Sequence, residues 1–101
     1  MKFKVIFHPD FYNDIQEAVQ WYNVQQKGLG TRFLLTVKKQ LKTLDNSALH
    51  FSIRYDDIRC MPIKKFPFLV HYRVNEHRRI VRVEAIFNTN RNPKIWEERI
   101  K

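Results

Sequence analysis

Residues 58–87 decide the fold, and they read IRCMPIKKFPFLVHYRVNEHRRIVRVEAIF. Inside this stretch, 68–74 and 80–87 each alternate strictly between two sets of side chains, which is the pattern of a β-strand with two different faces. The polar connection at 75–79 has a length that suits a hairpin. The sequence therefore predicts an antiparallel pair of strands. A third strand is expected at 58–65, just before the pair.

The alternation divides the predicted pair of strands into two faces. One face is expected to carry the apolar set Phe68, Val70, Tyr72, Val74, Val81, Val83, Ala85 and Phe87. The other face is mixed, and among its apolar side chains it carries His71, Arg73, Arg82 and Glu84. Because an antiparallel sheet can keep one face in water, we expect functional groups on this mixed face. Pro62 cannot donate to a ladder, so an edge or bulged position is predicted there.

The chain before residue 58 is expected to form a strand and then two helices. The strand spans 3–7, and Pro9 suits the first position of the helix that follows. Apolar residues recur at helical spacing in two stripes, which are Phe11, Ile15, Ala18, Val19 and Tyr22, and then Phe33, Leu34, Val37, Leu41 and Leu44. The glycine-containing turn at Lys27–Gly30 predicts that the two helices form a hairpin. Residues 45–57 have no clear period and are predicted to be a loop.

The C-terminal end completes the predicted topology. Asn92 and Pro93 are expected to open a short final helix, with Ile95 and Trp96 packing inward. The predicted fold class is therefore α+β, with the order β-α-α-β-β-β-α. A helical hairpin packs on a twisted, antiparallel-rich sheet of four strands. The first strand has no hairpin partner, so we expect it at an edge or beside a late strand.

Length and composition favour one small domain over residues 1–101. The chain is 44% hydrophobic, which is enough for one core, and it has no run near the ~20 apolar residues of a membrane helix. Its N-terminus has no signal-peptide pattern. Cys60 is the single cysteine and the four histidines are scattered, which argues against a disulfide framework and a metal site. We expect a cytoplasmic protein that needs no cofactor and no membrane.

The charge of the chain indicates an acidic partner. Nineteen Lys and Arg residues against ten Asp and Glu residues give a net charge of +9 at pH 7. Residues 54–101 hold twelve basic and six acidic residues, a net charge of +6, so most of the excess lies with the predicted sheet and the tail. A small domain with this excess usually meets nucleic acid, a ribosome, a membrane surface or an acidic protein. The simpler alternative is that the charge only favours solubility.

Four segments together resemble the RelE/ParE superfamily of bacterial type II toxin–antitoxin toxins, of the plasmid stabilisation type. They are FKVIFHPDFYNDIQEAVQWY at 3–22, KGLG followed by RFL within 27–34, RYDDIRCMPIKKFPFLVHYRV at 54–74, and AIFNTNRNPKIWEER at 85–99. The resemblance implies the same small fold, with a helical hairpin against a twisted sheet. It also implies a growth inhibitor that is neutralised by a cognate antitoxin, through an acidic segment that folds on binding.

The resemblance leaves two mechanisms open, because RelE-like members cleave mRNA in the ribosomal A site and ParE-like members poison DNA gyrase. Metal-free RNA cleavage needs a base, an acid, and cations that stabilise the crowded phosphate. His71 is the candidate for proton transfer. The candidate catalytic cations are Arg73, Arg82 and Arg91, whose guanidinium groups suit a phosphate. The candidate nucleic-acid contacts are Lys64, Lys65, Arg82 and Arg91.

Two departures from the RelE-like pattern favour the gyrase poison. RelE-like nucleases carry a late tyrosine where this chain has Trp96, which has no ionisable hydroxyl, and their central-strand arginine falls at Leu69. ParE-like toxins have no defined catalytic constellation, so these losses count only against cleavage. The alternative role for Arg73 and Arg82 is an ordinary ion pair with Glu84 across the strands. A ribosome-dependent mRNA endonuclease and a degenerate, non-toxic family member are the two alternative functions.

Overall fold

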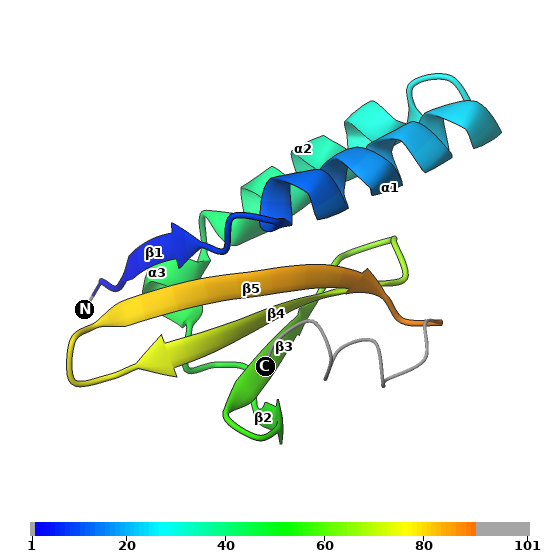
Figure 1. The fold of residues 1–101 in the computed structure, drawn as a ribbon. Coiled ribbons are helices and arrows are strands. Elements are labelled where there is room, and N and C mark those ends of the chain that lie inside the picture. Colours follow the sequence, from blue (N-terminus) through cyan, green and yellow to red (C-terminus); the bar gives the residue numbers. More distant parts are fainter. Residues whose placement is uncertain (1, 91–101) are drawn as a thin grey trace.

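Two long helices cover one face of a five-stranded sheet in the computed structural model, which describes residues 2–90 (Figure 1). The elements in chain order are β1 (Lys4–Phe7), α1 (Phe11–Gln25), α2 (Leu29–Leu41), α3 (Leu44–Ser47), β2 (Ile53–Tyr55), β3 (Ile58–Pro62), β4 (Phe68–Asn75) and β5 (Ile80–Asn88). The strands lie in the order β1-β5-β4-β3-β2. The α+β class and the helical hairpin are confirmed, and the predicted final helix lies outside the described residues.

The sheet has five strands in residues 2–90, where the sequence predicts four in the whole chain. The extra strand, β2, and the single turn of α3 both fall in 45–57, the predicted loop. Both elements are too short for a hydrophobic period to reveal them. β1 pairs in parallel with β5 at one edge of the sheet, where a first strand without a hairpin partner is expected. The other strand pairs are antiparallel.

A β-bulge interrupts the central hairpin of β4 and β5. Tyr72 lies opposite Val83, but the preceding residue of β4, His71, lies opposite Ala85. Glu84 is therefore an extra residue on β5 with no partner of its own in the register. Because side chains alternate along a strand, one extra residue exchanges the two faces for every residue beyond it.

Because of the bulge, the predicted faces of β5 are wrong for the residues beyond Glu84. Val81 and Val83 lie in the core under the helices, and Ile86 joins them there. Ala85 and Phe87, predicted on the same face as the two valines, instead lie in a second apolar cluster on the opposite side of the sheet. This side is termed the outer face, and its apolar cluster consists of Ile58, Cys60, Leu69, Ala85 and Phe87.

The two long helices are joined by a tight turn in which each glycine has its own role. Gly28 has a φ of +85°, in the left-handed region that glycine adopts without strain. Gly30 lies directly against α1, because a Cβ there would be 2.2 Å from the carbonyl oxygen of Val19. Its N–H donates to Oδ1 of Asn23 over 2.8 Å. This close approach holds α1 and α2 together as an antiparallel pair.

Three element boundaries differ from the predicted ones. α1 begins at Phe11, so Pro9 lies before the helix and not at its first position. α2 ends at Leu41, and Leu44, predicted in the same helix, begins α3 while keeping its buried side chain. β3 ends at Pro62 rather than at residue 65, because the chain turns directly after it, where the N–H of Phe66 donates to the carbonyl oxygen of Ile63 over 3.4 Å.

The main core lies between the helical hairpin and the sheet. Phe33 is fully buried, and its ring centroid is 4.9 Å from that of Phe68 and 5.3 Å from that of Tyr22. Tyr72 is also fully buried, and its hydroxyl donates to the carbonyl oxygen of Ala48 over 2.7 Å, so the core keeps its polar atom satisfied. Among residues 2–90, no helix has both the length and the apolar character required to cross a bilayer.

Candidate functional site

The bulge gathers four charged side chains on the outer face, termed the charged cluster. Arg73 and Arg82 lie directly opposite each other on β4 and β5, where two like charges repel. The carboxylate of Glu84 lies beside both, 2.7 Å from Nε of Arg82 and 3.3 Å from Nε of Arg73. Arg73 also reaches Asp57, with 2.6 Å between Nη1 and Oδ1. Each arginine is therefore engaged by at least one carboxylate.

The charged cluster is electrically neutral and partly buried. Glu84 is only 6% exposed, and a buried carboxylate is unfavourable unless cations compensate it. The two arginines supply this compensation, so their positive charge is neutralised by carboxylates within the protein. Two positive and two negative side chains cancel, so the outer face has no net charge at these four residues.

His71 lies on the same outer face but is fully buried. Its Nδ1 is 3.0 Å from the hydroxyl of Tyr55 and 3.5 Å from Sγ of Cys60. Its ring meets that of Phe87 edge-on, with centroids 5.3 Å apart. Burial, with a smaller contribution from the charge of Arg54, lowers the pKa of His71 to about 4. The imidazole is therefore neutral at pH 7 and lies inside the protein.

The two polar neighbours of His71 are poor nucleophiles at neutral pH. Burial raises the pKa of Cys60 to about 11 and raises the pKa of Tyr55 far above its ordinary value of 10.0. Because the thiolate and not the thiol is the reactive form of cysteine, Cys60 behaves as a small buried side chain. Residues 2–90 also contain no group of three or more His, Cys, Asp or Glu side chains placed to hold a metal ion.

The structure brings together only part of the predicted site. Three candidate catalytic residues lie on one face, and they are His71, Arg73 and Arg82. Lys64 and Lys65 lie in the turn before β4, and five residues of extended strand, roughly 17 Å, separate the start of β4 from Arg73. Arg91 lies outside the described residues. Among the described residues, the candidate nucleic-acid contacts Lys64, Lys65 and Arg82 therefore fall at different ends of the β4–β5 hairpin and do not form one patch.

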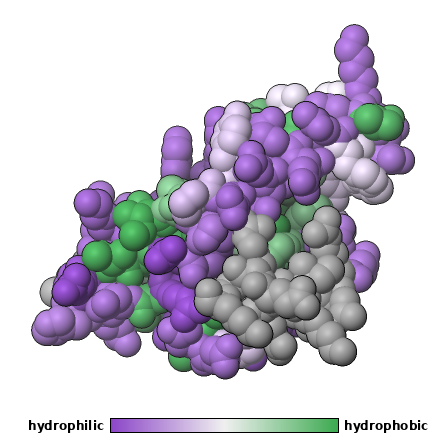
Figure 2. All heavy atoms as spheres, in the orientation of Figure 1, coloured by the Kyte–Doolittle hydropathy of each residue, from purple (hydrophilic) through white to green (hydrophobic). Residues whose placement is uncertain are grey.

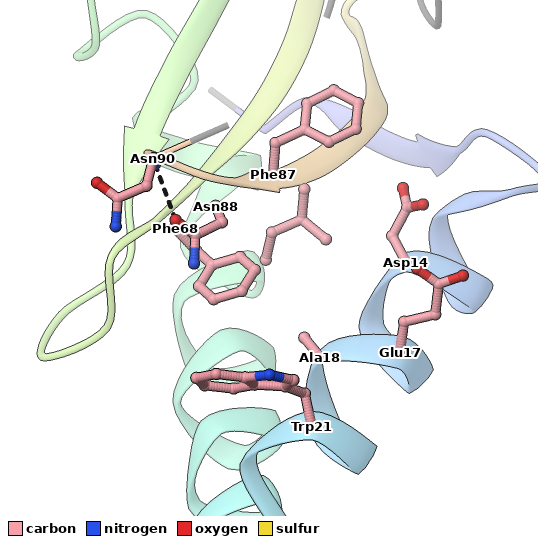
Figure 3. Close-up of a pocket in the computed structure, with 9 residues that line it drawn as sticks. Asp14, Glu17, Ala18, Trp21, Phe68, Phe87, Asn88 and Asn90 are labelled. Carbon is pink, nitrogen blue, oxygen red and sulfur yellow. Dashed lines mark hydrogen bonds between the residues drawn. The ribbon is translucent and has the colours of Figure 1, made fainter. Parts of the chain in front are cut away.

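A pocket of about 580 Å³ opens between α1 and the end of β5 (Figure 3). Asp14 and Glu17 stand on the α1 side, and Trp21 lies one turn further along the same helix. Phe68 and Phe87 contribute apolar walls from the sheet. The pocket thus combines carboxylates and aromatic rings, which gives it a different chemical character from the charged cluster.

The α1 side of this pocket can be predicted from the sequence. Asp14, Glu17 and Trp21 are separated by three and four residues, which places them on one side of a helix. The side chain of Trp21 is 57% exposed and lines the pocket. The opposite wall could not be predicted, because Ile86, which also lines the pocket, faces the helices only through the bulge at Glu84.

Solved structures of toxin–antitoxin proteins have the same fold. The chromosomal ParDE toxin–antitoxin system from P. aeruginosa matches with a TM-score of 0.75 and 15% identity, over 88% of this chain and 98% of that one. A double arginine-to-alanine mutant of the E. coli toxin RelE in the free state matches with a TM-score of 0.69 and 14% identity, over 99% and 96%. The archaeal RelE–RelB complex from Pyrococcus horikoshii OT3 matches with a TM-score of 0.56 and 15% identity, over 91% and 100%.

These matches define the class by fold, since the chain has the fold of RelE and ParE toxins, as the sequence resemblance predicts. No curated protein sequence matches the chain significantly. The sequence profile described as the ParE toxin of the type II toxin–antitoxin system parDE matches residues 5–93. The chain therefore belongs to the ParE toxin family of type II toxin–antitoxin systems.

Proposed function

We propose that this chain inhibits growth by poisoning DNA gyrase and that a cognate antitoxin neutralises it. The observation that carries the proposal is the charged cluster, in which Glu84 and Asp57 already engage Arg73 and Arg82. Cations held in this way are poorly placed to stabilise a phosphate during RNA cleavage. His71 is buried, so it is not placed to take a proton from a ribose hydroxyl. The match to the ParE family adds support.

A poison that acts by binding needs charge and shape rather than a catalytic constellation. Gyrase works with DNA bound, and a chain with a net charge of +9 is attracted to such a polyanionic complex. Lys64 and Lys65 are exposed in the turn between β3 and β4 and form no ion pair in residues 2–90. We assign these two lysines as contacts to the gyrase–DNA complex, and we place the chain in the cytoplasm as one working domain of residues 1–101.

A supercoiling assay with purified gyrase and relaxed plasmid tests the proposal. The chain should inhibit supercoiling and cause gyrase-dependent double-strand breaks in the plasmid. The double variant Lys64→Ala, Lys65→Ala should weaken inhibition by about tenfold, since removing phosphate contacts lowers affinity. The matched control Arg32→Ala, Lys39→Ala removes the same charge from exposed positions on α2 and should retain inhibition within about twofold.

Toeprinting of mRNA on ribosomes tests the competing RelE-like mechanism. We expect no new mRNA ends when the chain is added to ribosomes with a filled P site. Cleavage in the A site that is lost in both His71→Ala and Arg82→Ala would replace the gyrase proposal with a ribosome-dependent endonuclease. A folded chain that neither inhibits gyrase nor cleaves mRNA would instead be a degenerate, non-toxic member, and it would equally overturn the proposal.

A further inference from the structure

The pocket between α1 and the end of β5 has no role in the proposed function. Its volume of about 580 Å³ lies within the range of small-molecule sites, roughly 300–1,000 Å³. Three aromatic rings line it, Trp21 from α1 and Phe68 and Phe87 from the sheet. Sites for small molecules combine apolar walls of this kind with a few polar groups. The size and the walls of the pocket therefore suit a small ligand.

The charges of the pocket favour a cation. Asp14 and Glu17 line it, and none of the described residues that line it is basic. Hydrophilic side chains cover much of the helical hairpin (Figure 2), but these two carboxylates are the charged side chains of α1. Glu17 is exposed and forms no ion pair with another residue of 2–90. An anion would be repelled here, whereas a cation would be attracted.

The net charge of the whole chain does not prevent a cation from binding. A charge of +9 repels cations at long range, but physiological salt screens exposed charges beyond about 8 Å. A ligand in the pocket would contact the two carboxylates directly, while the basic side chains of the described residues lie outside its lining. The local attraction therefore exceeds the screened repulsion.

The position of Trp21 favours a planar cation. Its side chain is 57% exposed, and its ring stands at 78° to that of Tyr22, with the centroids 5.0 Å apart. In Figure 3 the indole points toward Phe68, and the carboxylates of Asp14 and Glu17 point from α1 toward β5. A guanidinium or amidinium group can stack on an aromatic ring and donate two parallel hydrogen bonds to a carboxylate. Both parts of the pocket can therefore contact one such group.

We propose that this pocket binds a small organic cation in which a guanidinium or amidinium group is joined to an apolar body. The ring of Trp21 stacks on the cation, and the carboxylate of Glu17 accepts hydrogen bonds from its N–H groups. Asp14 adds a second negative charge, and the apolar body packs against Phe68 and Phe87. The site shares no residue with the lysines of the β3–β4 turn, so it does not rest on the proposed function.

Calorimetric titration of the full chain with benzamidine tests the pocket directly. Benzamide, which has nearly the same shape and no charge, is the control ligand. Benzamidine should bind with a Kd below about 1 mM, and benzamide should bind at least about tenfold more weakly. Benzamidine should also shift the NMR signal of the indole N–H that disappears in Trp21→Leu. Equal binding of the two compounds, no detectable binding or an unmoved indole signal would overturn the site.

Substitutions in the pocket locate the binding to its lining. Glu17→Gln should weaken benzamidine binding by about tenfold and Trp21→Leu by about fivefold. The matched controls are Glu76→Gln, exposed in the β4–β5 turn, and Tyr12→Leu, 68% exposed on α1 outside the pocket. Each control should change binding by less than about twofold. All four side chains are exposed, so the variants should stay folded, which circular dichroism verifies. Equal weakening by a variant and its control would overturn the site.

Two further titrations identify the source of the cation. N-acetyl-arginine amide mimics an arginine of a partner protein and should bind no more tightly than benzamidine. Binding more than about tenfold tighter would assign the pocket to a partner's side chain and overturn the proposal of a small ligand. Arg91→Gln should bind benzamidine within about twofold of the parent chain. A tenfold gain would show that the chain's own arginine occupies the pocket, and it would equally overturn the proposal.

Discussion

The face of the sheet under the helices and the outer face are built from the same strands, but they are stabilised differently. Under the helices, Phe33, Val70 and Tyr72 are fully buried in a continuous apolar core. On the outer face, a small apolar cluster surrounds buried His71, and the carboxylate of Glu84 is held by two arginines. The helix-side core depends mainly on the burial of apolar side chains. The outer face also depends on charge and protonation, so the two faces should respond to different perturbations.

The largest expected effect is on the helix side of the sheet. Phe33→Ala should lower the free energy of unfolding by about 4 kcal/mol, because it opens a cavity among packed rings. Leu35→Ala on the same helix is the control. Because Leu35 is 61% exposed, this substitution should lower the free energy of unfolding by less than about 0.5 kcal/mol. Urea unfolding measures both variants. Similar losses for the two would show that the core is not where the structure places it.

A pH titration of stability should separate the two faces. The pKa of His71 is about 4 in the folded chain and 6.5 as its ordinary value, so between these values the unfolded chain binds more protons. The contribution of His71 to the free energy of unfolding is therefore fully present above pH 6.5. The free energy of unfolding should fall by about 3 kcal/mol as the pH decreases to 4. In His71→Gln this part of the pH dependence should be absent. Parallel pH profiles for the two proteins would contradict the burial of a neutral imidazole.

Removing the carboxylate of the charged cluster should have a moderate effect. Glu84→Gln keeps the shape of the side chain but leaves Arg73 and Arg82 facing each other without their shared anion, at an expected cost of about 2 kcal/mol. Glu76→Gln removes the same charge from an exposed position in the β4–β5 turn and should change stability by less than about 0.5 kcal/mol. Thermal unfolding at pH 7 distinguishes them. An unchanged unfolding temperature in Glu84→Gln would show that the charged cluster does not stabilise the outer face.

The smallest expected effect is in the β3–β4 turn, which belongs to neither face. Lys65 has a φ of +69°, where glycine is favoured over other residues. Lys65→Gly should therefore stabilise the chain by about 0.5 kcal/mol, whereas Lys64→Gly, at a residue with negative φ, should destabilise it by a similar amount. Denaturation midpoints of the two variants should move in opposite directions. A shift in the same direction would contradict the backbone conformation of this turn.

The sequence predicts the helix-facing residues of β4 correctly, because their alternation is uninterrupted and half of the strand faces the core. It fails within β5, where the extra residue Glu84 exchanges the faces of Ala85 and Phe87. A bulge of this kind carries neither glycine nor proline, so no residue type reveals it. Its position depends on which residues of β4 and β5 pair, which the composition of either strand alone does not determine.

The candidate site was predictable in its residue types but not in its environment. The ion pair of Arg73 and Arg82 with Glu84 is one of the alternatives that the alternation allows, and the structure contains it. The burial of His71 was not predictable, because its hydrogen-bonding neighbour Tyr55 belongs to a strand of three residues. Polarity alone predicts an exposed histidine on the mixed face, whereas tertiary packing buries it.

The most direct test of the central claim is to induce the chain in a bacterial host that lacks the antitoxin and to follow DNA and protein synthesis with short radiolabel pulses. Because we propose that the arginines of the outer face are structural and that gyrase is the target, DNA synthesis should stop first, in filamentous cells that still make protein. An early stop of protein synthesis with DNA synthesis intact would contradict this account. It would assign His71, Arg73 and Arg82 to mRNA cleavage instead.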